Sequence, residues 1–152
     1  LQKCAEQGFT SGSLEPADLP AVYETLRRNR EAKGYTLSLS LPDLRQMADL
    51  FPDRVHLFGV SDGPVLAAAA VCLKLSSKVL YVFYWGELPE FSRLSPVTML
   101  ARSIDDWCRT HGIELLDAGT STEGPKPNAG LIAFKESLGF RPSLKLRYAR
   151  TL

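Results

Sequence analysis

The stretch that says most about the fold runs from Asn128 to Phe140 and reads Asn-Ala-Gly-Leu-Ile-Ala-Phe-Lys-Glu-Ser-Leu-Gly-Phe. An asparagine favours the N-cap of a helix, because its side-chain oxygen can accept a hydrogen bond from a backbone N–H of the first turn. Gly139 favours the end of the same helix, since glycine enters the left-handed conformation of a C-cap without a steric cost. The stretch therefore predicts a helix of about three turns from Asn128 to Leu138.

The residues around this helix show a regular order of elements. Apolar residues at helical spacing predict helices at 17–33, after Pro42, and at 95–111, the last with Ser95 as its cap and Pro96 in its first turn. Runs of β-prone residues predict strands at 54–61, 65–75, 78–85, 114–119 and 144–150, and residues 120–127 read as a polar loop. An opening strand before residue 17 is left open by the sequence.

This order predicts a mixed sheet. Asp62-Gly63 and Ser76-Ser77 separate the first three of these strands by short turns, so these strands should form an antiparallel meander. The strand–helix–strand units that follow predict parallel pairing. The run from Val79 to Trp85 is almost wholly apolar, which is typical of a central strand covered on both faces. We therefore expect an α/β fold with one domain over residues 1–152.

The composition is that of an ordinary globular protein, with 152 residues of which 45% are hydrophobic and 23% charged. No apolar run approaches the roughly 20 residues that span a bilayer, and Lys3, Glu6 and Gln7 interrupt any signal-peptide core. A cytoplasmic protein with no membrane span is expected. The charge is uneven, because residues 124–152 carry six bases against one acid, Glu136, and this net charge of +5 suits an anionic ligand.

The cysteines argue against a disulfide framework. Cys4, Cys72 and Cys108 are odd in number and far apart, which favours reduced thiols, and the last two lie in apolar surroundings typical of buried packing residues. Neither His56 nor His111 has a motif around it that indicates an activated cysteine nucleophile. No cysteine and histidine cluster has zinc spacing, so we expect no metal.

The order of elements and the stretch from Asn128 to Phe140 together resemble the GNAT acyltransferase superfamily. Many of its members have an asparagine that opens the fourth helix and a Leu-Gly-Phe that closes it, and the resemblance covers Pro16 to Leu152. It implies a V-shaped cleft between two parallel central strands, here Val79–Trp85 and Glu114–Gly119. The acyl arm of a donor would lie in this cleft, where an amine would attack its carbonyl.

One departure from the superfamily narrows the resemblance. Many members have a tyrosine seven residues after the asparagine, where it protonates the leaving thiolate, and this chain has Lys135 there, preceded by Phe134. A Phe-Lys pair after a strand that reads Leu-Asp-Ala-Gly-Thr-Ser looks like the Fem-like branch, whose members transfer aminoacyl groups from tRNA onto peptidoglycan precursors. Since Fem-like proteins are commonly built from two GNAT-type domains, the chain would be the C-terminal one of two. The partner expected is a second GNAT domain or a second copy of the chain in a homodimer.

A second departure concerns the phosphate loop. Members that use acetyl-coenzyme A (acetyl-CoA) typically carry Gln/Arg-x-x-Gly-x-Gly/Ala before the third helix, where backbone N–H groups hold the pyrophosphate. This chain has Leu-Pro-Glu-Phe-Ser-Arg-Leu-Ser-Pro-Val from Leu88 to Val97, with no glycine between Gly86 and Gly112. Arg93, Ser95 and the N–H groups at the helix start are left to meet a phosphate. Acetyl-CoA and other acyl donors both remain open.

The resemblance assigns a catalytic role to Lys135, which could supply positive charge to an oxyanion or to a donor phosphate. A solvated lysine whose stem lies along an apolar helix face is the competing interpretation. Residues expected to bind donor or substrate near the cleft are Tyr84, Trp85, Arg93, Ser95, Asp117, Thr120, Ser121, Asn128 and Phe134. Of these, the two strand aromatics also suit simple packing, and Asp117 also suits a carboxylate that accepts backbone hydrogen bonds.

The function expected from this resemblance is an enzyme that transfers an acyl or aminoacyl group to an amine. The donor would be anionic, a thioester of coenzyme A (CoA) or an aminoacyl-tRNA, and the acceptor a small-molecule or peptide amine. Two alternatives are a non-catalytic or substrate-binding half of a larger Fem-like protein and a simple acetyl-CoA-dependent N-acetyltransferase. A module that binds RNA through the basic C-terminal third ranks last, because the strands lack the interleaved aromatic and basic residues of RNA-recognition sheets.

Overall fold

The computed structural model describes residues 2–123 and 126–145, and the chain divides into two compact units, Leu1–Asp117 and Ala118–Leu152. The first unit contains a five-stranded sheet of order β1-β2-β3-β4-β5. Its strands are β1 (Thr10–Leu14), β2 (Val55–Asp62), β3 (Val65–Ser76), β4 (Val79–Glu87) and β5 (Leu115–Asp117). Neighbours from β1 to β4 are antiparallel and β5 is parallel to β4, so the expected mixed α/β sheet is confirmed.

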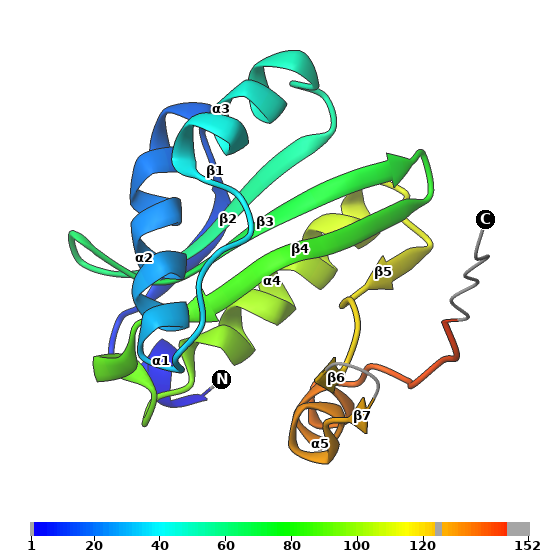
Figure 1. Ribbon diagram of the computed structural model, residues 1–152. Helices are drawn as coiled ribbons and strands as arrows, with labels where there is room; N and C mark the ends of the chain where they lie inside the picture. The colour runs from blue at the N-terminus through cyan, green and yellow to red at the C-terminus, as the bar shows by residue number, and fades with distance from the viewer. Residues whose placement is uncertain (1, 124–125, 146–152) are drawn as a thin grey trace. The chain divides into compact units, whose positions relative to one another are not determined.

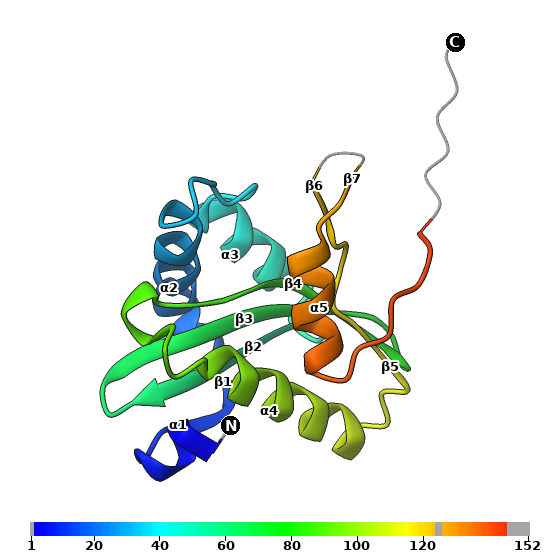
Figure 2. The same ribbon diagram turned by 90° about the horizontal axis from the view of Figure 1, so that it is seen from below.

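Helices cover both faces of this sheet. They are α1 (Gln2–Glu6), α2 (Leu19–Glu31), α3 (Leu41–Leu50) and α4 (Pro96–Thr110), with short 3-10 turns η1 (Pro16–Asp18) and η2 (Pro89–Phe91). The two views show α2 and α3 on one face and α4 on the other (Figures 1 and 2). The opening strand that the sequence left open is β1, and α1 was not expected.

The face under α2 and α3 holds one apolar cluster. Leu19, Val22 and Leu26 of α2 recur at helical spacing and are buried together with Leu44 of α3. They pack on side chains of three strands, namely Leu57, Ala69, Val71 and Tyr84. Each large side chain buried in this way contributes roughly 1.5–3 kcal/mol, so this cluster holds the two helices on the sheet.

The opposite face packs against α4. Leu100, Ile104 and Cys108 lie one or two turns apart on α4 and are all buried, as the sequence predicted. The strand beneath them, β3, has a run of fully buried small residues, Ala67 to Ala70. Small side chains let a helix approach the sheet backbone closely, and packing on both faces of β3 follows from this.

A β-bulge in β4 changes which face its side chains occupy. Cys72 is paired with Val82 and Val71 with Tyr84, so Phe83 is an extra residue on β4. Because Val71 and Cys72 point to opposite faces of the sheet, their partners Val82 and Tyr84 do as well. The bulge therefore reverses the alternation along β4, so that Leu80 and Val82 are buried on the α4 face and Tyr84 on the α2 face.

In the second unit, the predicted helix is α5 (Ala129–Ser137). Asn128 is its N-cap, with the side-chain oxygen accepting from the Leu131 N–H at 2.9 Å, and Gly139 follows the helix with a φ of 93°. Both features of the opening stretch of sequence are thus confirmed.

The segment before α5 is more regular than the sequence indicated. Residues 120–127 were expected to be a loop, but they contain a short antiparallel ladder between β6 (Thr122–Glu123) and β7 (Lys126–Pro127). Of the predicted strand at 144–150, residues 146–150 lie outside the described residues, and Leu144 is 94% exposed and in no strand.

Within residues 2–123 and 126–145, no helix is both long and apolar enough to cross a membrane. All three cysteines are free and buried. Burial raises the pKa of the Cys108 thiol to about 11 and raises that of Cys72 further. Both thiols are therefore protonated at neutral pH, which fits the expected role as packing residues.

The partly buried ring of His56 should make the stability of the protein depend on pH. Its ring packs on Trp107 of α4 with ring centroids 4.7 Å apart, its Nε2 has no hydrogen-bond partner among the described residues, and burial lowers its pKa. Because the folded state disfavours the charged ring, stability should fall as the pH drops through the unfolded value of about 6.5 and level off below the folded pKa. His56→Phe keeps the ring stacking and should remove this component. Thermal melting of both proteins between pH 8 and 5 checks it, and parallel pH profiles would contradict it.

Candidate active site

The site begins where β4 and β5 stop pairing. Their parallel ladder has only the pairs Val79–Leu115, Leu80–Leu116 and Tyr81–Asp117, whereas β4 continues to Glu87. The bulge at Phe83, which lies in the pairing of β4 with β3, comes two residues after Tyr81. The parallel pairing thus covers all of β5, and β4 extends beyond the end of β5 as far as Glu87. We call this step at the edge of the sheet the fork.

The two aromatic residues predicted near the fork lie on opposite faces of β4. Tyr84 is 7% exposed, and its hydroxyl is hydrogen-bonded to the Ser38 hydroxyl and accepts from the Leu39 N–H at 3.1 Å. It thus anchors the segment between α2 and α3. Trp85 is paired with Ala70 on the α4 side and is partly buried.

A carboxylate occupies the N-terminal end of α4. Glu87 accepts a hydrogen bond through Oε2 from the Val97 N–H at 3.1 Å. Pro96 has no N–H, and the Thr98 N–H donates to the Ser95 carbonyl at 2.9 Å. The N–H groups of this first turn are therefore absent or already hydrogen-bonded.

The prediction that the Ser95 side chain caps α4 is wrong. Ser95 is the N-cap residue, but its backbone is left-handed with a φ of 51°, and its hydroxyl donates to the Ser92 carbonyl at 3.3 Å. In this backbone conformation the side chain is directed into the preceding loop, and Glu87 accepts the hydrogen bond from Val97 instead.

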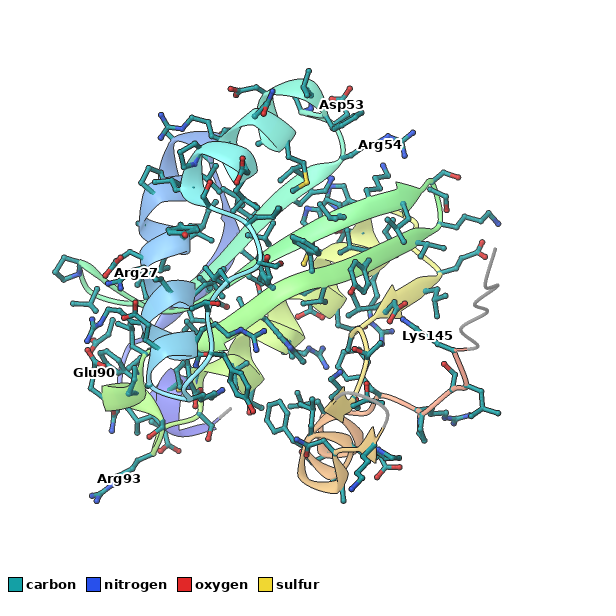
Figure 3. The ribbon with its side chains drawn as sticks, viewed as in Figure 1. Arg27, Asp53, Arg54, Glu90, Arg93 and Lys145 are labelled. Atoms are coloured by element: carbon teal, nitrogen blue, oxygen red, sulfur yellow. The ribbon has the colours of Figure 1, made fainter. Side chains whose placement is uncertain are left out.

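The loop before α4 places its charged residues at the surface. Arg93 is exposed and points away from the ribbon (Figure 3). Glu90 forms a salt bridge with Arg28 of α2, with 2.8 Å between nitrogen and oxygen, and both side chains are exposed. Arg93 is therefore not directed toward the start of α4, and the carboxylate of Glu90 would repel a phosphate.

A polar network joins the end of β4 to α2. The Asn29 side chain, 4% exposed, donates through Nδ2 to the Glu87 carbonyl at 2.7 Å, and Lys33 Nζ donates to Asn29 Oδ1 at 3.4 Å. Burial raises the pKa of Glu87, while the Val97 hydrogen bond and the charge of Lys33 oppose this. Burial and, to a smaller extent, Arg30 lower the pKa of Lys33.

Sequence reasoning missed Glu87 and Asn29. Glu87 directly follows the apolar strand and precedes the loop to α4, which was the available signal, but its reach to Val97 depends on the tertiary path of that loop. Asn29 lies three residues after Leu26 on the buried stripe of α2, so helical spacing was a signal for its burial, but only the packing of α2 on β4 reveals its partner, the Glu87 carbonyl.

The second unit holds the other predicted residues. Lys135 is 6% exposed, and its Nζ donates to the carbonyls of Gly119 at 3.2 Å and Thr120 at 2.9 Å. The interpretation as a solvated helix lysine is therefore wrong. The Asn128 N–H donates to the Ser121 carbonyl at 2.9 Å, and Phe134 is partly buried on α5. The catalytic role of Lys135 stays a prediction.

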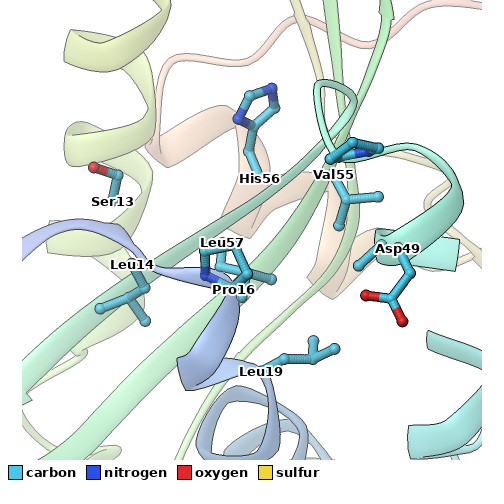
Figure 4. Close-up of a pocket in the computed structure, with 10 residues that line it drawn as sticks. Ser13, Leu14, Pro16, Leu19, Asp49, Val55, His56 and Leu57 are labelled. Atoms are coloured by element: carbon cyan, nitrogen blue, oxygen red, sulfur yellow. The ribbon is translucent and has the colours of Figure 1, made fainter. Parts of the chain in front are cut away.

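A hollow of about 410 Å³ lies elsewhere in the first unit. Residues of β1, η1, α2, α3 and β2 line it, and none of the named lining residues belongs to β4 or β5. Asp49 and His56 extend in different directions there, so they do not form an acid–base pair (Figure 4). The hollow does not coincide with the fork.

Comparison with known proteins decides the family. The model of the family described as "Acetyltransferase (GNAT) domain" matches residues 1–135. The chain belongs to this GNAT acetyltransferase family. A search of curated proteins found no match.

Solved structures support the same fold. The ribosomal-protein-S18-alanine N-acetyltransferase of Escherichia coli is similar with 25% identity and a TM-score of 0.68, over 90% of this chain and 79% of that one. An aminoglycoside acetyltransferase from an uncultured soil metagenomic sample, in complex with sisomicin, has 16% identity and a TM-score of 0.74, over 97% and 98%. AAC(6')-Iy, bound to the bisubstrate analogue CoA-S-monomethyl-acetylneamine, has 15% identity and a TM-score of 0.71, over 95% and 98%.

This GNAT domain is thus an acetyltransferase-type enzyme by family. These comparisons identify the GNAT family and do not distinguish its Fem-like branch. Among the residues that the structure describes, no group of three or more histidine, cysteine or acidic side chains is arranged to hold a metal ion.

The role of Lys135 in holding its own unit together can be tested directly. Lys135→Met keeps the apolar stem but removes the donors to Gly119 and Thr120. The loss of hydrogen bonds from a buried charged group should cost about 2 kcal/mol of local stability. Hydrogen exchange of peptides from residues 118–138 should therefore become faster. Lys126→Met, at an exposed position on β7, is the matched control. Equal exchange in the two variants would contradict this role.

Proposed function

We propose that this GNAT domain moves an acyl or aminoacyl group from an activated donor to the amine of a small molecule or peptide. The observation that carries the proposal is the fork, in which β4 pairs with β5 only up to Tyr81 and continues to Glu87. The acyl arm of the donor would lie beside the part of β4 that follows the bulge. Family membership supports acyl transfer as the chemistry.

The reaction needs little covalent help from the protein. The amine nitrogen forms a bond with the donor carbonyl carbon, the bond from that carbon to sulfur or oxygen breaks, and an amine proton ends on the leaving group. Holding both reactants in line and stabilising the oxyanion account for most of such catalysis. In this proposal Asp117, at the end of β5, is a candidate to orient the amine.

The identity of the donor is proposed from the start of α4. A pyrophosphate bound at a helix N-terminus needs free backbone N–H groups there, and the first turn of α4 has Pro96, a Val97 N–H bonded to Glu87 and a Thr98 N–H bonded to Ser95. This supports a donor that does not place its phosphates on α4. An aminoacyl ester of tRNA would be such a donor. The Phe134-Lys135 pair supports the same Fem-like assignment.

A simple acetyl-CoA-dependent N-acetyltransferase is the second candidate. It is favoured by the E. coli ribosomal-protein acetyltransferase, at 25% identity, and by the structures of AAC(6')-Iy with a CoA-derived bisubstrate analogue and with CoA. For both candidates, residues 1–152 are proposed to act as a single GNAT domain, and only the Fem-like candidate makes it one half of a two-domain protein. In the Fem-like case, the neighbouring domain would complete the acceptor site.

The donor choice is tested by binding and by transfer. Acetyl-CoA should bind weakly or undetectably in isothermal titration, because α4 offers no N–H to its pyrophosphate. A dissociation constant of about 1 µM, equivalent to about −8 kcal/mol, would instead support the acetyltransferase candidate.

Transfer is measured by mass spectrometry of a panel of amines with acetyl-CoA or with aminoacyl-tRNA as donor, using the full chain with any partner domain. Acylated amine from the tRNA donor alone is the expected result. Absence of product with both donors would contradict N-acyl transfer itself.

A further inference from the structure

Glu87 is placed where helix N-termini of many proteins bind phosphate. Its carboxylate lies 3.1 Å from the Val97 N–H, at the positive end of the dipole of α4, a helix of 15 residues. The side chain comes from the end of β4, and a chain segment of eight residues, Leu88 to Ser95, separates it from the helix. The anion at this helix end therefore belongs to the protein itself.

The network with α2 fixes this placement. The Asn29 side chain donates to the backbone carbonyl of Glu87 at 2.7 Å, which holds the last residue of β4 against α2. At Gly86, an added Cβ would lie 2.5 Å from the side-chain atoms Cγ and Oδ1 of Asn29, so only glycine fits beside that side chain. With the backbone held, the Glu87 side chain extends across to α4.

A purely structural cap would be simpler to build. The ordinary solution is a serine or aspartate side chain at the N-cap itself, and Ser95 stands at the N-cap without using its side chain in this way. The chain instead uses a half-buried carboxylate from another element, and burial raises the pKa of Glu87. The arrangement blocks the helix end as well as capping it.

We propose that Glu87 is a donor-specificity residue, whose carboxylate fills the anion-binding end of α4 and selects against donors that place a pyrophosphate there. This inference rests on the proposed acyl transfer and names the residue that restricts its donor. Asn29 and Gly86 are positioning residues in this scheme, because they act through the backbone of Glu87. Because the Val97 N–H donates to Glu87, it is not free to donate to a phosphate of the donor.

The test compares two matched pairs of variants, Glu87→Ala with Glu90→Ala and Glu87→Gln with Glu90→Gln. Glu90 lies close by in sequence and loses the same charge, but its carboxylate is paired with Arg28 at the surface. The probes are inorganic pyrophosphate and CoA, titrated by calorimetry and by the chemical shift of the Val97 amide.

Glu87→Ala frees the Val97 N–H and should bind both probes roughly tenfold or more tightly than wild type, the ratio that one charge-assisted hydrogen bond contributes. Glu87→Gln keeps an acceptor for Val97 and should gain less, but still more than Glu90→Gln. The Val97 amide signal should shift with pyrophosphate in Glu87→Ala and not in wild type.

The outcomes separate the inference from the function. Equal affinities in the Glu87 and Glu90 variants, with thermal melting showing that they fold, would overturn the role of Glu87 and leave the proposed acyl transfer standing. Binding of CoA by wild type at about 1 µM would overturn the donor choice itself. If Glu87→Ala does not fold, the glutamine pair alone decides, since equal affinities there also overturn the inference.

Discussion

The bulge in β4 is the constraint on which the rest of the first unit depends. Before it, β4 pairs with β5 and its buried side chains belong to the α4 face, and after it Tyr84 turns toward α2. One extra residue on β4 thus reverses which face of the sheet its later side chains occupy. The position of Gly86 against Asn29 of α2 follows from that reversal.

The start of α4 is connected to the same constraint. Since Asn29 holds the backbone of Glu87, the carboxylate can reach the Val97 N–H across the loop. A helix N-terminus carries partial positive charge and unsatisfied N–H groups, and these must be met by a side chain, by water or by a ligand. In this protein the Glu87 side chain accepts from the Val97 N–H and the Ser95 carbonyl from the Thr98 N–H, whereas a glycine-rich loop would leave such N–H groups to a donor phosphate.

The second unit shows how one position can change its role. In many GNAT enzymes the residue seven positions after the asparagine is a tyrosine, and here it is Lys135. The Lys135 ammonium group donates to the Gly119 and Thr120 carbonyls and so holds α5 against these two residues. A loop and the short β6–β7 ladder separate them from α5 in the sequence. A buried cation that donates to carbonyls is stable there because its hydrogen bonds replace those lost with water.

The sequence by itself determined the order of elements from α2 to β5, the mixed sheet, the two caps of α5 and the buried faces of α2 and α4, because these depend on local spacing and on the properties of single residues. The sequence also showed that the loop before α4 lacks the glycines of a phosphate-binding loop. Only the tertiary structure decided the bulge at Phe83, the burial of Lys135 and the reach of Glu87 to Val97. These depend on contacts between residues far apart in the chain, and a pattern of neighbours along the sequence carries no record of which backbone group a side chain will meet.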